Sequence, residues 1–157
     1  MTAASAPAPG RWVFALVLVV ACAQRQPTAS GKPSTHPIAE TDRAAIVATV
    51  KDYFEGWFAG DATRMERALH PALVKRGIKR DGSISRPITA QEMIEYTKKG
   101  EGKAERPADL ALEITVDDIY GDIATATVYS AIYVEYVQLL KTPAGWRILN
   151  TVYQRRP

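Results

Sequence analysis

Cysteine, histidine and long hydrophobic runs are scarce in this chain of 157 residues. The single cysteine excludes an internal disulfide, and two histidines leave few residues for a His- or Cys-based metal site. The sequence also has no Gly-rich phosphate loop and no G-x-S-x-G motif. We therefore predict no metal and no cofactor, and the sequence lacks the usual signatures of nucleotide-binding proteins and serine hydrolases.

An excess of charge of one sign is lacking too. The chain has 20 Lys and Arg residues against 17 Asp and Glu residues, a formal net charge of +3. This balance does not provide the basic stripe that nucleic-acid binding needs, so no nucleic-acid partner is predicted. The densest basic cluster is Lys75, Arg76, Lys79 and Arg80. We favour a solvated edge strand protected from aggregation, and the alternative is contact with anionic lipid head groups.

The apolar run Trp12–Ala21 is too short to span a bilayer, which takes ~20 residues, but it has the length of a signal-peptide core. It ends at Ala21-Cys22, which resembles a bacterial lipoprotein lipobox. This resemblance implies that residues 1–21 are a lipoprotein signal peptide and that Cys22 is lipidated. The alternatives are a plain signal peptide with an incidental cysteine and a short anchor that is never cut.

The segment after the lipobox is rich in Pro, Ser, Thr and Gly and shows no apolar periodicity. We interpret residues 22–38 as a flexible, lipid-anchored linker. Residues 39–157 then form a single domain that is large enough for a hydrophobic core. The predicted location is the bacterial cell envelope, exported and lipid-anchored; the alternative is a secreted or periplasmic protein.

Apolar side chains repeat with helical period in the first part of this domain. They are Ile46, Val47, Val50, Tyr53, Phe54, Trp57 and Phe58. Thr41 is the expected N-cap of this helix and Gly60 its end, because glycine adopts the left-handed conformation without steric cost. Asp61 is expected to cap a shorter second helix, and Pro71 to end it.

The rest of the domain reads as one helix followed by strands. Thr89 and Glu92 form a capping box at the start of a third helix, which Gly100 ends, and Glu101–Ala108 is expected to be a surface loop. Alternating or β-rich segments at 74–79, 112–117, 123–131, 133–141 and 146–155 predict strands. Helices first and strands last indicate an α+β domain with an antiparallel sheet. A long helix on a curved sheet of this kind leaves a cavity between them.

Five segments carry a resemblance to a known family. They are DYFEGWFAGD, ALHPALVKR, ITAQEMIEYT, VDDIYGDIATATV and YVEYVQLLKTPAGWRILNTV. Over about residues 40–155 the chain resembles the putative lumazine-binding family, within the nuclear transport factor 2-like group. The resemblance implies a cone of three N-terminal helices packed on a curved antiparallel sheet, with a deep pocket and a homodimeric assembly. It supplies no catalytic residues to carry over.

Ketosteroid isomerases belong to the same fold group, and their pattern is present only in part. Tyr53, seven residues before Gly60, matches the hydrogen-bonding tyrosine of those enzymes. Gly77 stands where their aspartate base lies, and Val137 stands where their second aspartate lies. Removal of a carbon-bound proton needs a carboxylate base, and a lysine-rich strand does not replace it at neutral pH. Isomerase activity of that type is therefore not predicted.

Five residues are candidates for a ligand-binding pocket: Tyr53, Trp57, Arg76, Glu135 and Asn150. Tyr53 and Trp57 would either pack in the core or stack on a planar ring. Arg76 would meet an anionic ligand or extend to water. Asn150 interrupts an apolar strand face and needs a hydrogen-bond partner, in the protein or in a ligand.

Two classes of function fit these candidates best. The first is a membrane-tethered domain that binds a small molecule and has no catalytic set of residues. The alternative is a cyclase- or isomerase-like enzyme that uses a pocket carboxylate, Glu135 or Asp118. A third class, a dimeric interaction domain with a vestigial pocket, stays open, and the sequence does not decide whether the protein is an enzyme.

Overall fold

The computed structural model describes residues 40–157 except Asp109. The helices in this range are α1 (Glu40–Ala59), α2 (Ala62–Ala68), α3 (Ala90–Lys99) and α4 (Glu101–Ala104), and the strands are β1 (Leu69–Ile78), β2 (Leu112–Tyr120), β3 (Ile123–Ser130), β4 (Tyr133–Thr142) and β5 (Gly145–Arg155). The predicted signal peptide, the Cys22 lipidation site and the linker lie outside the described residues. Among the described residues, no helix has the length and hydropathy needed to cross a bilayer.

The strands form one sheet in the order β1-β5-β4-β3-β2. β2 to β5 are joined as antiparallel neighbours, as expected from the alternating segments of the sequence. β1 instead pairs parallel with β5, so the sheet is mixed and not wholly antiparallel. A parallel pair needs a long crossover connection, and the long segment from α3 to β4 supplies one between β1 and β5.

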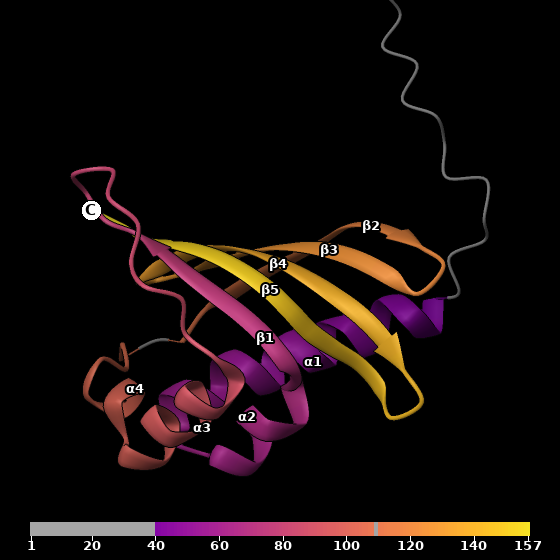
Figure 1. The fold of residues 1–157 in the computed structure, drawn as a ribbon, viewed down its shortest axis with the longest axis horizontal. Coiled ribbons are helices and arrows are strands. Elements are labelled where there is room, and N and C mark those ends of the chain that lie inside the picture. The colour runs from indigo at the N-terminus through magenta and orange to yellow at the C-terminus, as the bar shows by residue number, and fades with distance from the viewer. Residues whose placement is uncertain (1–39, 109) are drawn as a thin grey trace, which may run out of the picture. The chain divides into compact units, whose positions relative to one another are not determined.

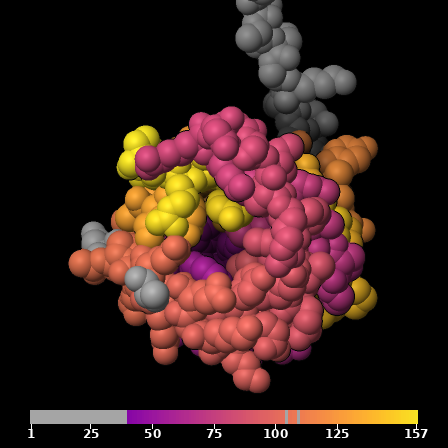
Figure 2. All heavy atoms as spheres, turned by 60° about the vertical axis from the view of Figure 1, so that its left-hand side comes forward, coloured from indigo at the N-terminus to yellow at the C-terminus, as the bar shows by residue number. Residues whose placement is uncertain are grey.

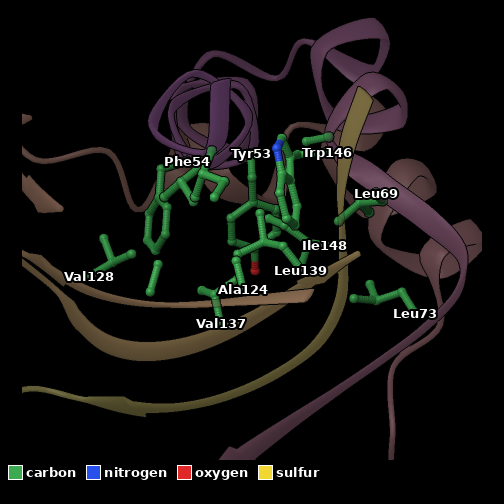
Figure 3. Close-up of a cluster of buried hydrophobic side chains, with 14 of the residues drawn as sticks. Tyr53, Phe54, Leu69, Leu73, Ala124, Val128, Val137, Leu139, Trp146 and Ile148 are labelled. Carbon is green, nitrogen blue, oxygen red and sulfur yellow. The ribbon is translucent and has the colours of Figure 1, made fainter. Parts of the chain in front are cut away.

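The described helices lie on one face of the curved sheet, and within the described residues no helix covers the other face (Figure 1). α1 packs against the inner face through apolar side chains that include Ile46, Val50, Phe54 and Phe58, all of them buried. Figure 3 shows Phe54 and Tyr53 reaching from α1 toward the sheet, where Val128, Val137 and Ile148 complete the core. The helical periodicity of the sequence therefore predicted the main packing contact of the domain.

The predicted helix ends are mostly confirmed. Gly60 ends α1 with a φ of 68°, and the Asp61 carboxylate accepts hydrogen bonds from two backbone N–H groups at the start of α2. Thr89 and Glu92 form both hydrogen bonds of the capping box of α3, and Gly100 follows α3 with a φ of 80°. Local chemistry therefore fixes these helix ends.

Three boundaries differ from the prediction. α1 already includes Glu40, so Thr41 lies within the helix and is not its N-cap. α2 ends at Ala68, and Pro71 lies inside β1, where an edge strand tolerates the missing N–H group. The segment expected as a loop, Glu101–Ala108, begins with the short helix α4.

Candidate functional site

A pocket opens between the inner face of the sheet and helices α1, α3 and α4, and Figure 2 shows its opening with α1 atoms in its depth. The cavity measures about 260 Å³. This is slightly below the ~300–1,000 Å³ of sites for drug-sized ligands, so its size suits a molecule of one or two fused rings. Aromatic side chains dominate its walls: Tyr53, Phe54, Trp57, Tyr96, Tyr133 and Tyr153.

The inner part of the pocket holds a polar group of three side chains, Tyr53 from α1, Lys75 from β1 and Glu135 from β4, here called the inner cluster. Lys75 Nζ lies 2.7 Å from Glu135 Oε1 and donates to the Tyr53 hydroxyl at 2.6 Å. The Tyr53 hydroxyl donates in turn to Glu135 Oε1 at 3.0 Å. The side chains of Lys75 and Glu135 are only 8% and 2% exposed. The inner cluster is therefore a buried ion pair bridged by a phenol.

Lys75 was not among the residues predicted for the site, because the inward phase of β1 was assigned incorrectly. The sequence predicts Arg76 for the pocket, on the same strand face as Val74 and Ile78. In the structure Leu73, Lys75 and Gly77 are buried and Arg76 is exposed. Because strand side chains alternate with period two, an error of one residue exchanges the two faces of the whole strand. Arg76 does not reach the pocket.

A β-bulge explains why Asn150 is also outside this pocket. Ile148 pairs with Leu139 but Asn150 pairs with the next residue, Gln138, so Leu149 is an extra residue in β5. After the bulge the inward phase moves to Thr151 and Tyr153, whereas the sequence pattern continued it from Ile148 to Asn150. Asn150 lines a separate depression.

The structure thus brings together three of the five predicted candidates, Tyr53, Trp57 and Glu135, which all line the pocket. The alternative carboxylate, Asp118, is exposed and lies with Asn150 in the separate depression. Binding of a ligand by any of the five residues stays a prediction.

Burial changes the proton affinities of the inner cluster. It lowers the pKa of Lys75, because the charged ammonium loses water, and the nearby Glu135 carboxylate opposes part of this change. Burial also raises the pKa of Tyr53 well above its usual value, and the charge of Glu135 raises it further. The ring of Tyr153 faces Lys75, with Nζ 3.9 Å from the ring centroid.

A second polar group, here called the rim cluster, consists of Glu105, Tyr133 and Arg155 and lies in the outer, more exposed part of the pocket lining. Arg155 Nη1 lies 2.8 Å from Glu105 Oε1, and the Tyr133 hydroxyl donates to the other oxygen of the same carboxylate. Arg155 also donates to the Tyr133 hydroxyl at 3.2 Å. The side chains of Arg155 and Glu105 are 54% and 35% exposed, so this ion pair is in contact with water.

α4 places Glu105 at the rim, and Gly102 allows α4 to lie against α1. A Cβ atom at position 102 would come 2.2 Å from the carbonyl oxygen of Trp57, so only glycine permits this approach. This close packing holds α4 against α1 in a segment whose charged composition predicted a loop.

These geometries define what the site can do. The inner cluster can orient a polar group of a ligand or exchange protons with it, and the aromatic walls can stack on planar rings. Within the described residues, no group of three or more His, Cys, Asp and Glu side chains could hold a metal ion.

The family described as Putative lumazine-binding matches residues 41–154. The chain belongs to this family. The matched region contains the whole inner cluster and nearly all of the elements from α1 to β5. No curated protein matches the chain in sequence.

Solved structures similar to this family member have the nuclear transport factor 2-like fold. A nuclear transport factor 2-like protein of unknown function from Methylobacillus flagellatus is 20% identical, with a TM-score of 0.62, covering 77% of this chain and 97% of that chain. One from Shewanella baltica is 19% identical (TM-score 0.61; 78% and 99% covered). A ketosteroid isomerase-like protein from Erwinia carotovora atroseptica is 18% identical (TM-score 0.51; 75% and 95% covered). Such identities establish the α+β fold alone.

Proposed function

We propose that this protein is an exported, lipid-anchored domain that binds a small planar molecule in its pocket without converting it. The observation that carries the binding proposal is a small aromatic cavity with a single buried polar group, the inner cluster, at its inner end. Mostly apolar walls with a few fixed polar atoms are typical of small-molecule sites. The description of the family, which names lumazine as a ligand, supports a planar heterocycle.

The binding proposal can be tested on the whole protein, purified from membranes in mild detergent. Native mass spectrometry and absorbance spectra should detect a co-purified ligand. Thermal unfolding with added flavin, lumazine and steroid probes should give a concentration-dependent rise in Tm for at least one class. An empty pocket that no probe stabilises would contradict the proposal for these classes.

The anchoring proposal depends on Cys22, which follows the lipobox-like segment. Expression in bacteria supplied with labelled palmitate should give a labelled membrane protein, and Cys22→Ala should lose both the label and the membrane association. A wild-type protein that carries no lipid would contradict this proposal.

We also propose that the protein is a homodimer that associates through the open face of the sheet. Tyr129, Tyr136 and Val152 are exposed there, and a patch of exposed apolar and aromatic side chains is typical of an interface. Sedimentation should show a dimer for the wild type and a monomer for Tyr136→Lys at the same concentration. A monomeric wild type would contradict this assembly.

Catalysis by the inner cluster is the second candidate function, favoured by the direct contacts that Glu135 makes with a lysine and a phenol. It would not follow the ketosteroid isomerase arrangement, in which the aspartate base stands at the position of Gly77. A Cβ atom added at Gly77 would lie 2.7 Å from the ring of Tyr153, which occupies this space. If a substrate is found, Glu135→Gln should abolish turnover in this candidate function. Turnover that survives the substitution would exclude a catalytic Glu135.

A further inference from the structure

The two carboxylate oxygens of Glu135 are in unequal environments. Oε1 accepts a hydrogen bond from Tyr53 and lies within ion-pair distance of Lys75 Nζ. Oε2 accepts no hydrogen bond from any described residue. A buried carboxylate normally has both oxygens hydrogen-bonded, so the free lone pairs of Oε2 require a partner.

Oε2 faces the cavity. Glu135 lines the pocket, and its side chain is 2% exposed. Among the described residues, the fully buried side-chain atom that has no hydrogen-bond partner is Oγ1 of Thr151. Oε2 also has no partner among them, so it is not fully buried. Oε2 therefore retains access to the pocket, and an atom of a ligand can reach it.

The rest of the inner cluster offers no free donor. The Lys75 ammonium donates hydrogen bonds to Tyr53 and to Glu135 Oε1, and it also lies against the ring of Tyr153. The Tyr53 hydroxyl proton is engaged by Glu135. A ligand therefore meets an acceptor at the inner end of the pocket, and a ligand that presents only an acceptor there would face an unpaired carboxylate oxygen.

The charges of Lys75 and Glu135 cancel within the inner cluster. A charged group of a ligand would lose its water there without an unpaired counter-charge, which is unfavourable. An uncharged donor avoids this cost and still satisfies Oε2.

We propose that the ligand is an uncharged planar molecule of one or two fused rings that donates a ring N–H to Oε2 of Glu135. This inference rests on the proposed binding function and adds a specificity for the ligand. The pocket discriminates between ring N–H donors and isosteric ring acceptors. The aromatic walls bind both kinds of ring, so the part of the affinity difference that Glu135→Gln removes is assigned to this carboxylate.

Indole and benzofuran are suitable probes, because they have nearly the same size and planarity and differ in an N–H donor against an oxygen acceptor. Their dissociation constants for the whole protein can be measured by calorimetry or by ligand-detected NMR. A hydrogen bond to a charged acceptor predicts that indole binds at least roughly tenfold more tightly than benzofuran.

The substitution Glu135→Gln replaces the acceptor-only carboxylate by an amide that can both donate and accept. It should reduce the preference for indole to less than about threefold, since either probe can then be paired. The matched control is Glu113→Gln, which removes an exposed carboxylate outside the pocket lining and should retain the tenfold preference. If Glu135→Gln does not fold, the double variant Lys75→Met/Glu135→Gln removes the buried charge as well and tests the same loss.

The outcomes separate this inference from the binding proposal. Saturable binding of both probes with equal affinity, or a tenfold preference that survives Glu135→Gln, would overturn the donor assignment and leave the pocket function standing. Absence of binding of both probes would count against the donor assignment. Absence of binding by the flavin, lumazine and steroid probes as well would count against the pocket function itself.

Discussion

The two polar clusters of the pocket contain the same classes of residue but differ in their exposure to water. Each contains one basic residue, one glutamate and one tyrosine: Lys75, Glu135 and Tyr53 in the inner cluster, and Arg155, Glu105 and Tyr133 in the rim cluster. The inner ion pair is almost fully buried, whereas about half of the Arg155 side chain and a third of the Glu105 side chain are exposed. The two clusters therefore differ mainly in the burial of their ion pairs.

Because the inner cluster is buried, the free-energy cost of each ion depends on whether its partner is present. In water, an ion pair and two separated solvated ions have similar free energies, so the rim pair contributes little. In the interior, an ion without its partner has neither water nor counter-charge, so removal of one partner is far more costly than the pair itself is stabilising. Such a pair is weak support for stability, which is consistent with the binding function proposed above.

The largest effect is expected for Lys75→Met, which leaves the Glu135 carboxylate buried without its counter-charge. We expect the free energy of unfolding to fall by about 3–5 kcal/mol, measured by urea unfolding at neutral pH.

The control for this prediction is the double variant Lys75→Met/Glu135→Leu, which replaces the whole pair by apolar side chains. Its stability should lie within about 1–2 kcal/mol of wild type or exceed it, because buried ion pairs are often no better than packed apolar groups. A double variant as unstable as the single one would show that packing or the unpaired Tyr53 hydroxyl, and not the unpaired charge, causes the loss.

The next largest effect is expected at the rim, for Gly102→Ala. The new methyl group would meet the backbone of Trp57, which cannot move like a flexible side chain, so α4 must shift away from α1. Overpacking of this kind costs about 1–3 kcal/mol, to be measured by thermal unfolding. The neighbouring exposed substitution Glu101→Ala should stay within about 0.5 kcal/mol of wild type. Equal effects of the two substitutions would contradict the close packing of α4.

Alkaline unfolding tests the burial of the two tyrosines. The raised pKa of Tyr53 means that the folded protein keeps a proton that the unfolded chain loses near pH 10, so stability falls above that pH by about 1.4 kcal/mol per pH unit. The pKa of the half-buried Tyr133 is also raised, mainly by burial. Tyr53→Phe and Tyr133→Phe should each reduce the slope of stability against pH above 10, by up to about 1.4 kcal/mol per pH unit for each tyrosine.

The titration of Lys75 changes the stability in the opposite direction. Its lowered pKa means that the unfolded chain binds the proton more tightly, so this group adds stability as the pH rises toward its usual value of 10.5. Slopes are therefore compared between variants above pH 10.5, where this contribution is complete. An unchanged slope in Tyr53→Phe would contradict the burial of its hydroxyl beside Glu135.

Much of the fold was predictable because its signals are local. The helix-ending Gly60 and Gly100, the N-cap Asp61 and the capping box at Thr89 each act within a few residues of the chain, and all are confirmed. The parallel pairing of β1 with β5 was not predictable from alternation, which gives the faces of a strand but neither its neighbour nor its direction.

The site was less predictable because it depends on the phase of strands and on long-range pairing. Glu135 and Tyr53 were among the candidates, but the missing partner Lys75 is a charged residue that the alternation placed on the wrong face. A buried lysine is stable only with a partner, and that partner lies 60 residues away. The bulge at Leu149 moved Asn150 out of the pocket for a similar reason, since one extra residue reverses the faces beyond it.

The smallest effect is expected for the rim ion pair. Arg155→Gln should lower the free energy of unfolding by no more than about 1 kcal/mol, because both ions remain hydrated when they are separated. The difference from wild type should shrink further in 1 M salt, where the screening length is ~3 Å. Lys75→Met measured in the same salt should keep most of its loss, since salt does not reach a buried pair. If the two variants responded equally to salt, burial would not be what separates the two clusters.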